Sequence, residues 1–286
     1  MRRTMLYLPG NNPNMLTRGY LFGSDGIILD LEDAVAMVEK DTARILVSKY
    51  LQQGEFGDCY VSVRINGIDT EYWKDDLAAI VPNKRLDGIR VPKVEDENTV
   101  KIIDEELSRL EEQNGLPVGK LSLHCLLETA HGIWNAYEIA KASPRIEAII
   151  PGGEDLRADL KTNRSDDSTE LEWARRMLVF AARAAGVEPL DTVFARITDD
   201  EGLRKETEFI KQLGFSGKSI IHPNQIKIIH DIFTPTEQEI AKAQKIIAAA
   251  KEAAERGQGA VTVDGKMVDI PVVKRAEYTL VRAGLA

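Results

Sequence analysis

Near the middle of the chain the sequence reads Ile146-Glu147-Ala148-Ile149-Ile150-Pro151-Gly152-Gly153-Glu154-Asp155, so that an apolar run leads directly into two glycines and two carboxylates. The apolar residues are typical of a buried strand, and the glycines indicate a turn that leaves the backbone open to a ligand. Carboxylates at the edge of a core are costly unless they are paired or bind a metal ion. We therefore expect the chemistry of the protein here, although the stretch alone equally fits a turn whose acids face water.

Seven further runs of strand length lie along the chain, at residues 5–8, 26–33, 60–67, 87–93, 121–128, 190–196 and 217–222. Helical spacing fills connections between them, at residues 35–51, 95–113, 132–142 and 168–185. Eight strands with helices in the connections predict an α/β fold of the (β/α)8 TIM-barrel type. The alternative is an open doubly wound sheet, but no Gly-rich dinucleotide fingerprint follows the first strand.

The pattern changes after Ile232. A solvated helix is predicted over residues 236–256, a hinge at Gly257-Gln258-Gly259, a short hairpin over 261–269 and a last helix over 272–282. We predict a barrel domain over residues 1–233 and a C-terminal extension over residues 234–286. The extension is too short for a core of its own, so it is expected to pack on the barrel or on a neighbouring subunit.

The composition excludes several classes of partner. The chain has 286 residues, 43% of them hydrophobic and 29% charged, with a net charge of -9 and no basic block. This charge argues against nucleic acid and against an anionic membrane. No apolar run is long enough to cross a bilayer or to form a signal peptide, and Cys59 and Cys125 lie in apolar runs that suit reduced thiols. We expect a soluble, cytoplasmic protein.

Charged side chains fall at the predicted strand ends, which form the active-site face of such barrels. They are Asp30, Glu32, Asp33, Arg64, Lys93, Glu128, Glu154, Asp155, Arg196 and His222. A single acid at a strand end carries little information. Acids and bases at the ends of seven consecutive strands indicate an active site.

Glu128 and Asp155 follow adjacent strands, whose backbones lie about 4.8 Å apart. Two carboxylates so placed could share one Mg²⁺ or Mn²⁺ ion, with water and substrate oxygens completing its coordination. The alternative is a pair of acids neutralised by Arg64 or Lys93. The histidines and cysteines lack the spacing of a zinc site.

Arg64 precedes the turn Asn66-Gly67 at the end of the third strand. A guanidinium at a barrel mouth can bind a substrate carboxylate through two parallel hydrogen bonds. The alternative role of Arg64 is a salt bridge to Asp30 or Glu32. The Gly152-Gly153 backbone would let a ligand approach closely and would offer it N–H donors. Lys218 follows Gly217 but lacks the upstream glycine and spacing of a P-loop.

An ordered set of motifs carries a family resemblance that runs from about Arg3 to the C-terminus. The motifs are Arg3-Thr4-Met5-Leu6-Tyr7-Leu8-Pro9-Gly10, Leu29-Asp30-Leu31-Glu32-Asp33-Ala34-Val35, Val63-Arg64-Ile65-Asn66-Gly67, Arg90-Val91-Pro92-Lys93, Leu127-Glu128-Thr129-Ala130, Gly152-Gly153-Glu154-Asp155-Leu156, Gly217-Lys218-Ser219-Ile220 and Asp264-Gly265-Lys266-Met267-Val268-Asp269. Together they resemble citrate lyase β subunits, which are citryl thioester lyases. These belong with the malyl-CoA and citramalyl-CoA lyases in the HpcH/HpaI aldolase superfamily.

The resemblance implies an Mg²⁺ site (Mn²⁺ as an alternative) at Glu128 and Asp155. Arg64 is expected to hold the oxo-acid part of the substrate and to act in catalysis by stabilising the developing enolate oxygen. It also implies that Asp269, on the C-terminal hairpin, reaches a neighbouring subunit as catalytic base. The candidate substrate-binding residues are Tyr7, Arg18, Arg64, Glu128, Gly153 and Glu154.

The implied reaction is the Mg²⁺-dependent cleavage of a citryl thioester to oxaloacetate and an acetyl thioester. The carrier is CoA or the phosphopantetheine of an acyl-carrier protein. Asn11 and Asn12 favour the latter, because relatives that use CoA carry basic residues in this loop and here only Arg18 is basic. The implied assembly is a homotrimer or a higher homo-oligomer, with citrate lyase α subunits and acyl-carrier γ subunits as further partners.

Three alternatives to this reaction stay open. Thr129-Ala130 stands where many β subunits have Ser-Pro, which leaves room for a malyl-CoA or citramalyl-CoA lyase. An aldolase of the same superfamily that cleaves free 4-hydroxy-2-oxo acids is the second. A non-catalytic subunit that binds a metabolite is the third.

Overall fold

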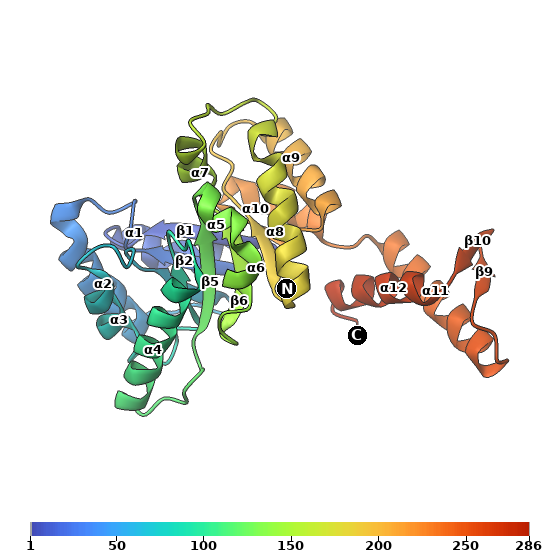
Figure 1. Ribbon diagram of the computed structural model, residues 1–286, viewed down its shortest axis with the longest axis horizontal. Coiled ribbons are helices and arrows are strands. Elements are labelled where there is room, and N and C mark those ends of the chain that lie inside the picture. The colour runs from blue at the N-terminus through green and yellow to red at the C-terminus, as the bar shows by residue number, and fades with distance from the viewer. Residues whose placement is uncertain (1, 286) are drawn as a thin grey trace. The chain divides into compact units, whose positions relative to one another are not determined.

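The computed structural model describes residues 2–285, so that Met1 and Ala286, the outermost residues of the two predicted domains, lie outside the described residues. The chain forms two compact units, residues 2–230 and residues 231–285. The first carries the strands of a barrel, and the second consists of helices and a hairpin (Figure 1).

Eight parallel strands close into a barrel in chain order, with β8 beside β1. They are β1 (Thr4–Pro9), β2 (Gly26–Asp30), β3 (Tyr60–Arg64), β4 (Gly88–Val91), β5 (Ser122–Leu127), β6 (Ile146–Pro151), β7 (Glu188–Asp191) and β8 (Gly217–Ile220). Helices in the connections cover the outside, so the predicted (β/α)8 barrel is confirmed.

Ten α-helices begin in the first unit: α1 (Pro13–Arg18), α2 (Lys40–Gln53), α3 (Trp73–Ile80), α4 (Glu97–Gln113), α5 (Ala130–Trp134), α6 (Ala136–Ala140), α7 (Gly153–Asp159), α8 (Glu172–Ala185), α9 (Asp200–Leu213) and α10 (Asn224–Phe233). Helix α4 begins where the Asp96 side chain accepts a hydrogen bond from Thr99 N, and it buries Val100, Ile103 and Leu107 at helical spacing. Among residues 2–285, every helix is too short or too polar to cross a lipid bilayer.

The barrel interior is an apolar core with polar groups at both ends. Its central cluster consists of Met5, Ile28, Leu126, Ala148, Ile150 and Leu190, all buried. Tyr7 and Tyr60 are half-buried and pack against this cluster. The strands read as continuous apolar runs because helices also cover their outer faces.

The seventh strand differs from its prediction. It spans Glu188–Asp191 instead of residues 190–196, and it pairs with β8 through Leu190 and Asp191. The reason is that the Asp191 carboxylate is drawn into a buried ion network, after which the chain leaves the barrel wall. Arg196 therefore lies in a loop and not at a strand end.

The second unit contains α11 (Glu237–Glu255), β9 (Val261–Val263), β10 (Lys266–Val268) and α12 (Ile270–Arg282). Strands β9 and β10 pair antiparallel through a turn at Asp264 and Gly265, which have φ of 48° and 73°. Positive φ at both central positions is the geometry that favours Asp-Gly in hairpins. The Asp269 side chain then caps α12 by accepting a hydrogen bond from Val272 N.

Candidate active site

A cavity of about 440 Å³ opens at the carboxyl ends of the barrel strands. Six of the eight candidate site residues line it: Tyr7, Arg64, Glu128, Gly153, Glu154 and Asp155. They come from β1, β3, the end of β5 and the start of α7. Tyr7, which lies closest to the core, forms part of the floor together with Leu126 and Ile150.

Arg64 is held by carboxylates of the neighbouring strand and loop. Its Nε and Nη2 donate to the two Asp30 oxygens at 2.7 and 2.6 Å, and its Nη1 lies 2.8 Å from Glu32 and 3.1 Å from Asp33. Burial lowers the pKa of Arg64, but the charge of Asp30 outweighs it and holds that pKa well above its usual value. Arg64 thus lines the cavity, as expected for a residue that binds substrate. It also makes salt bridges to Asp30 and Glu32, the alternative role considered from the sequence.

Glu128 is a buried carboxylate whose charge is poorly compensated. Its exposed fraction is 3%, and its Oε2 accepts a hydrogen bond of 2.9 Å from Lys93 N. Burial, with the nearby charge of Asp155, raises the pKa of Glu128 to about 7. Burial also raises the pKa of Glu32 to about 8, and burial with the charge of Asp33 raises that of Asp155. The acids at the cavity mouth therefore outnumber the cations that face them.

Two glycines allow close packing at the cavity wall. A Cβ on Gly152 would lie 2.3 Å from Glu128 Cγ and 2.6 Å from its Oε1, so that only glycine leaves room for this carboxylate. Gly153 begins α7 and donates from its backbone N to Thr192 Oγ1 at 3.0 Å. Asp155 follows in the first turn of α7, where the helix dipole favours negative charge.

Lys93, one of the residues at the predicted strand ends, has a backbone φ of 52°. This left-handed conformation is rare for a residue with a side chain and is found where the surrounding structure enforces it, often at functional sites. It aims the backbone N of Lys93 at Glu128, while the Nζ lies 3.7 Å from Glu32 Oε1. Lys93 therefore fixes the orientation of Glu128.

Four other residues that the sequence singled out do not line the cavity. Arg18 is exposed at the end of α1 and does not line the cavity. Asp269 belongs to the C-terminal unit, where it is half-buried and accepts its bond from Val272 N at 3.3 Å. The predicted strand-end position of Arg196 is wrong, because the chain leaves β7 before this residue, and it pairs with Asp199 at 2.9 Å. His222 accepts a hydrogen bond from Asn224 N at the start of α10.

The donor set fits Mg²⁺ or Mn²⁺. Within residues 2–285, no three His, Cys, Asp or Glu side chains gather closely enough to hold a metal ion by themselves. Mg²⁺ usually takes one or two protein carboxylates and completes its octahedron with water and substrate oxygens. Glu128 and Asp155 offer such a pair, and a divalent cation would offset the burial and the nearby Asp155 charge that raise the pKa of Glu128.

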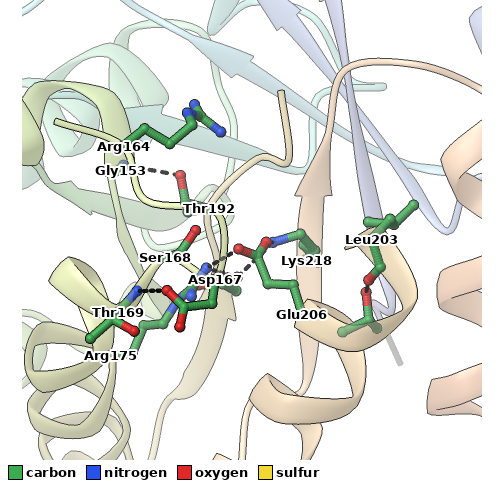
Figure 2. A network of polar contacts seen from close by, with 12 residues as sticks. Gly153, Arg164, Asp167, Ser168, Thr169, Arg175, Thr192, Leu203, Glu206 and Lys218 are labelled. Atoms are coloured by element: carbon green, nitrogen blue, oxygen red, sulfur yellow. Dashed lines mark hydrogen bonds and ion pairs between the residues drawn. The ribbon is translucent and has the colours of Figure 1, made fainter. Parts of the chain in front are cut away.

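A buried ion network behind the cavity wall was not predicted. Lys218 Nζ lies 2.6 Å from Asp191 and 2.7 Å from Glu206, and Arg175 Nε lies 2.9 Å from Asp191. Figure 2 shows Arg175, Glu206 and Lys218 pointing toward one another from α8, α9 and β8. Lys218 thus has a structural role. The network fixes the end of β7, and the next residue, Thr192, accepts the bond from Gly153 N.

Comparisons with known proteins show the family of the chain. A model of the family described as HpcH/HpaI aldolase/citrate lyase matches residues 3–223. A citrate lyase subunit beta from Leuconostoc mesenteroides subsp. cremoris is 46% identical over 280 residues, which cover 98% of this chain and 92% of the relative. A (3S)-malyl-CoA thioesterase from Cereibacter sphaeroides is 37% identical over 281 residues, which cover 98% of this chain and 94% of the relative.

Among solved structures, the protein CitE from Mycobacterium tuberculosis, in complex with magnesium, acetoacetate and coenzyme A, aligns with a TM-score of 0.80 and 31% identity. The alignment covers 99% of this chain and 98% of the other. The similarity therefore extends over both the barrel and the C-terminal unit. On this evidence the chain belongs to the HpcH/HpaI aldolase/citrate lyase family and is a lyase.

Proposed function

We propose that this lyase cleaves a citryl thioester to oxaloacetate and an acetyl thioester, with Mg²⁺ held by Glu128 and Asp155. The observation that carries the proposal is the surplus of carboxylates at the cavity mouth, where burial and the charge of Asp155 raise the pKa of Glu128 to about 7. The citrate lyase β subunit that is 46% identical and the magnesium bound by the related CitE support it.

A bound Mg²⁺ polarises substrate oxygens and makes a bound hydroxyl more acidic. The chain supplies the geometry around it. Lys93 N fixes Glu128, the first turn of α7 presents Asp155, and Gly152 leaves the space that Glu128 fills. The buried position of Glu128 limits access of water, which strengthens every electrostatic contact at the site.

Arg64 would bind a substrate carboxylate by exchanging one of its present partners. The buried Asp30 carboxylate accepts two short hydrogen bonds from the guanidinium, so this pair fixes the orientation of Arg64. Asp33 lies farther away, at 3.1 Å, and its side chain is 62% exposed. We propose that the substrate replaces Asp33 at Nη1, because an exposed ion pair of this kind contributes little stability.

Asp269 is the proposed catalytic base, contributed by a neighbouring subunit of a homotrimer or higher homo-oligomer. Its carboxylate would accept the proton of the tertiary hydroxyl as the adjacent C–C bond breaks. The electron pair of that bond passes to the thioester as an enolate, which takes up a proton to become the acetyl thioester. The carbon that carried the hydroxyl becomes the carbonyl of oxaloacetate.

The carrier is proposed to be a phosphopantetheine arm, with CoA as the alternative. The loop after β1 carries the side-chain amides of Asn11 and Asn12, whereas the phosphates of a nucleotide are bound best by cationic side chains. Asn11 donates a hydrogen bond to Glu39 at 2.7 Å, and Asn12 caps α1. Arg18 is exposed on α1 and is the candidate contact for a carrier phosphate. The 37% identical (3S)-malyl-CoA thioesterase favours a malyl thioester as the second candidate substrate.

The test is oxo-acid release from citryl-CoA, malyl-CoA and citramalyl-CoA, each with and without Mg²⁺. Preferential, Mg²⁺-dependent release of oxaloacetate from citryl-CoA is expected. Glu128→Gln and Asp155→Asn should each lower the rate by at least about 100-fold, because each removes a charged metal ligand. Glu138→Gln, at an exposed acid of α6 paired with Lys141, is the matched control and should be unaffected. Faster cleavage of malyl-CoA, or release without metal, would contradict the proposal.

A further inference from the structure

A buried arginine crosses the barrel beneath the cavity. Arg90 lies on β4, and its Nη1 donates to Ser219 Oγ on β8 at 2.9 Å and to Tyr7 Oη on β1 at 3.2 Å. Strands β4 and β8 are four positions apart in a ring of eight, so the side chain spans the interior. Its exposed fraction is 0%.

The charge of Arg90 has no carboxylate partner within residues 2–285 that would make an ion pair. Its Nε and Nη2 are buried and donate to no group of the described chain. Its guanidinium lies 5.4 Å from the centre of the Tyr7 ring, whose partial negative charge compensates only part of the lost hydration. A buried charge that lacks a counterion is costly, and sites that bind an anion supply the missing charge from the ligand.

The direction of the hydrogen bonds follows from the chemistry of the guanidinium. Arginine has donors and no acceptor, so the oxygens of Tyr7 and Ser219 must both accept from Arg90. Each hydroxyl proton then points away from Arg90. Both residues line the cavity, and their protons are therefore available to an acceptor that enters it.

We infer that the Tyr7 and Ser219 hydroxyls, held by Arg90, form a subsite at the cavity floor for a carboxylate of the substrate. The identity of that substrate rests on the proposed function. The subsite uses neutral donors with a fixed positive charge behind them, which is an arrangement that stabilises anions in a site with little water. Arg90 acts here as a positioning residue.

The polarity of the cavity supports a carboxylate over a metal ion at the floor. Its mouth carries Asp30, Asp33, Glu128, Glu154 and Asp155, which outnumber the Arg64 cation beside them, so the mouth attracts cations and takes an anion at Arg64. Its floor carries the hydroxyl donors of Tyr7 and Ser219, with the Arg90 charge behind them. These groups attract anions and repel cations. A substrate with several carboxylates would thus be oriented by the two ends, one directed to the cation at the mouth and one to the floor.

The test uses variants that remove a single hydroxyl, Tyr7→Phe and Ser219→Ala, and their combination. Calorimetric titration with oxaloacetate at saturating Mg²⁺ should show binding weakened by roughly 10-fold for each variant, which is the usual effect of losing a hydrogen bond to a charged group. The affinity for Mg²⁺ alone should not change. KM for the thioester should rise more than kcat falls.

Matched controls are Tyr60→Phe and Ser62→Ala, which remove hydroxyls that bond Ser122 and Ile27 O outside the cavity lining. They should bind oxaloacetate as the native chain does. Arg90→Gln removes the charge, and should weaken binding beyond either hydroxyl variant if it folds. Native affinity in the Tyr7→Phe/Ser219→Ala double variant would overturn the subsite. Absence of oxaloacetate binding and of thioester cleavage by the native protein would instead overturn the proposed function.

Discussion

Gly152 shows how a single residue without a side chain can make room for a proposed metal ligand. It lies directly against Glu128, and a Cβ at this position would approach Glu128 Cγ to 2.3 Å. Glu128 cannot yield easily, because Lys93 N holds its other oxygen and the side chain is buried. The absence of a methyl group at residue 152 is therefore part of the proposed Mg²⁺ site.

Gly152→Ala is expected to push Glu128 out of position and to weaken Mg²⁺ binding by roughly 10- to 100-fold, the usual effect of disturbing the support of a metal ligand. Titration calorimetry with Mg²⁺ measures this. Gly259→Ala is the matched control, since a Cβ there meets nothing within 4 Å and the residue is exposed. Equal Mg²⁺ affinity in the two variants would argue against Glu128 as a ligand.

The charged residues of the cavity lining could be predicted from the sequence, one residue at a time. Acids and bases at strand ends identified Arg64, Glu128 and Asp155, because the strand ends of a barrel converge on one face. The same reasoning could not find Arg90, which reads as one charged residue inside an apolar strand. Its role depends on β1 and β8, which meet it only once the barrel has closed.

At the scale of elements, β7 and β8 are attached to α8 and α9 by buried charges. Asp191 lies between Arg175 and Lys218, and Glu206 accepts from both cations. All four side chains are buried, with Glu206 the most accessible at 8%. The apolar periodicity that predicted the strands carries no information on such pairing, so the extent of β7 was predicted wrongly. Helices α3, α7 and α9 were also absent from the prediction.

Lys218→Met is expected to lower the free energy of unfolding by about 3–5 kcal/mol, because it leaves Asp191 and Glu206 buried with Arg175 as their sole ion-pair partner among residues 2–285. Urea unfolding followed by circular dichroism measures the change. Lys205→Met on α9 removes an exposed pair with Glu201 and should cost less than about 1 kcal/mol. An unchanged urea midpoint for Lys218→Met would mean that the network contributes nothing to stability.

At the scale of the whole molecule, the two ends of the barrel interior have different polarity and different tasks. The cavity end gathers carboxylates around Arg64, whereas Tyr60, at the start of β3, stacks its ring on that of His124 with 5.2 Å between the ring centres. His124 is fully buried, and neither of its ring nitrogens makes a hydrogen bond among residues 2–285. The Glu147 carboxylate lies 3.7 Å from Nε2, but it is paired with Arg2 at 2.6 Å, and burial outweighs its effect on His124. A neutral imidazole tolerates this position, but an imidazolium does not.

Burial lowers the pKa of His124 from 6.5 to about 4, which makes global stability depend on pH. Between these values the unfolded chain binds a proton that the folded chain does not, so stability is lost as the pH falls. The loss should approach 1.4 kcal/mol per pH unit and total roughly 3 kcal/mol for this group. His124→Phe should remove this part of the slope in urea unfolding between pH 6.5 and pH 4, and should not destabilise the protein at pH 7. His131→Gln, at an exposed histidine, should keep the native slope. An unchanged slope in His124→Phe would mean that other groups cause the acid sensitivity.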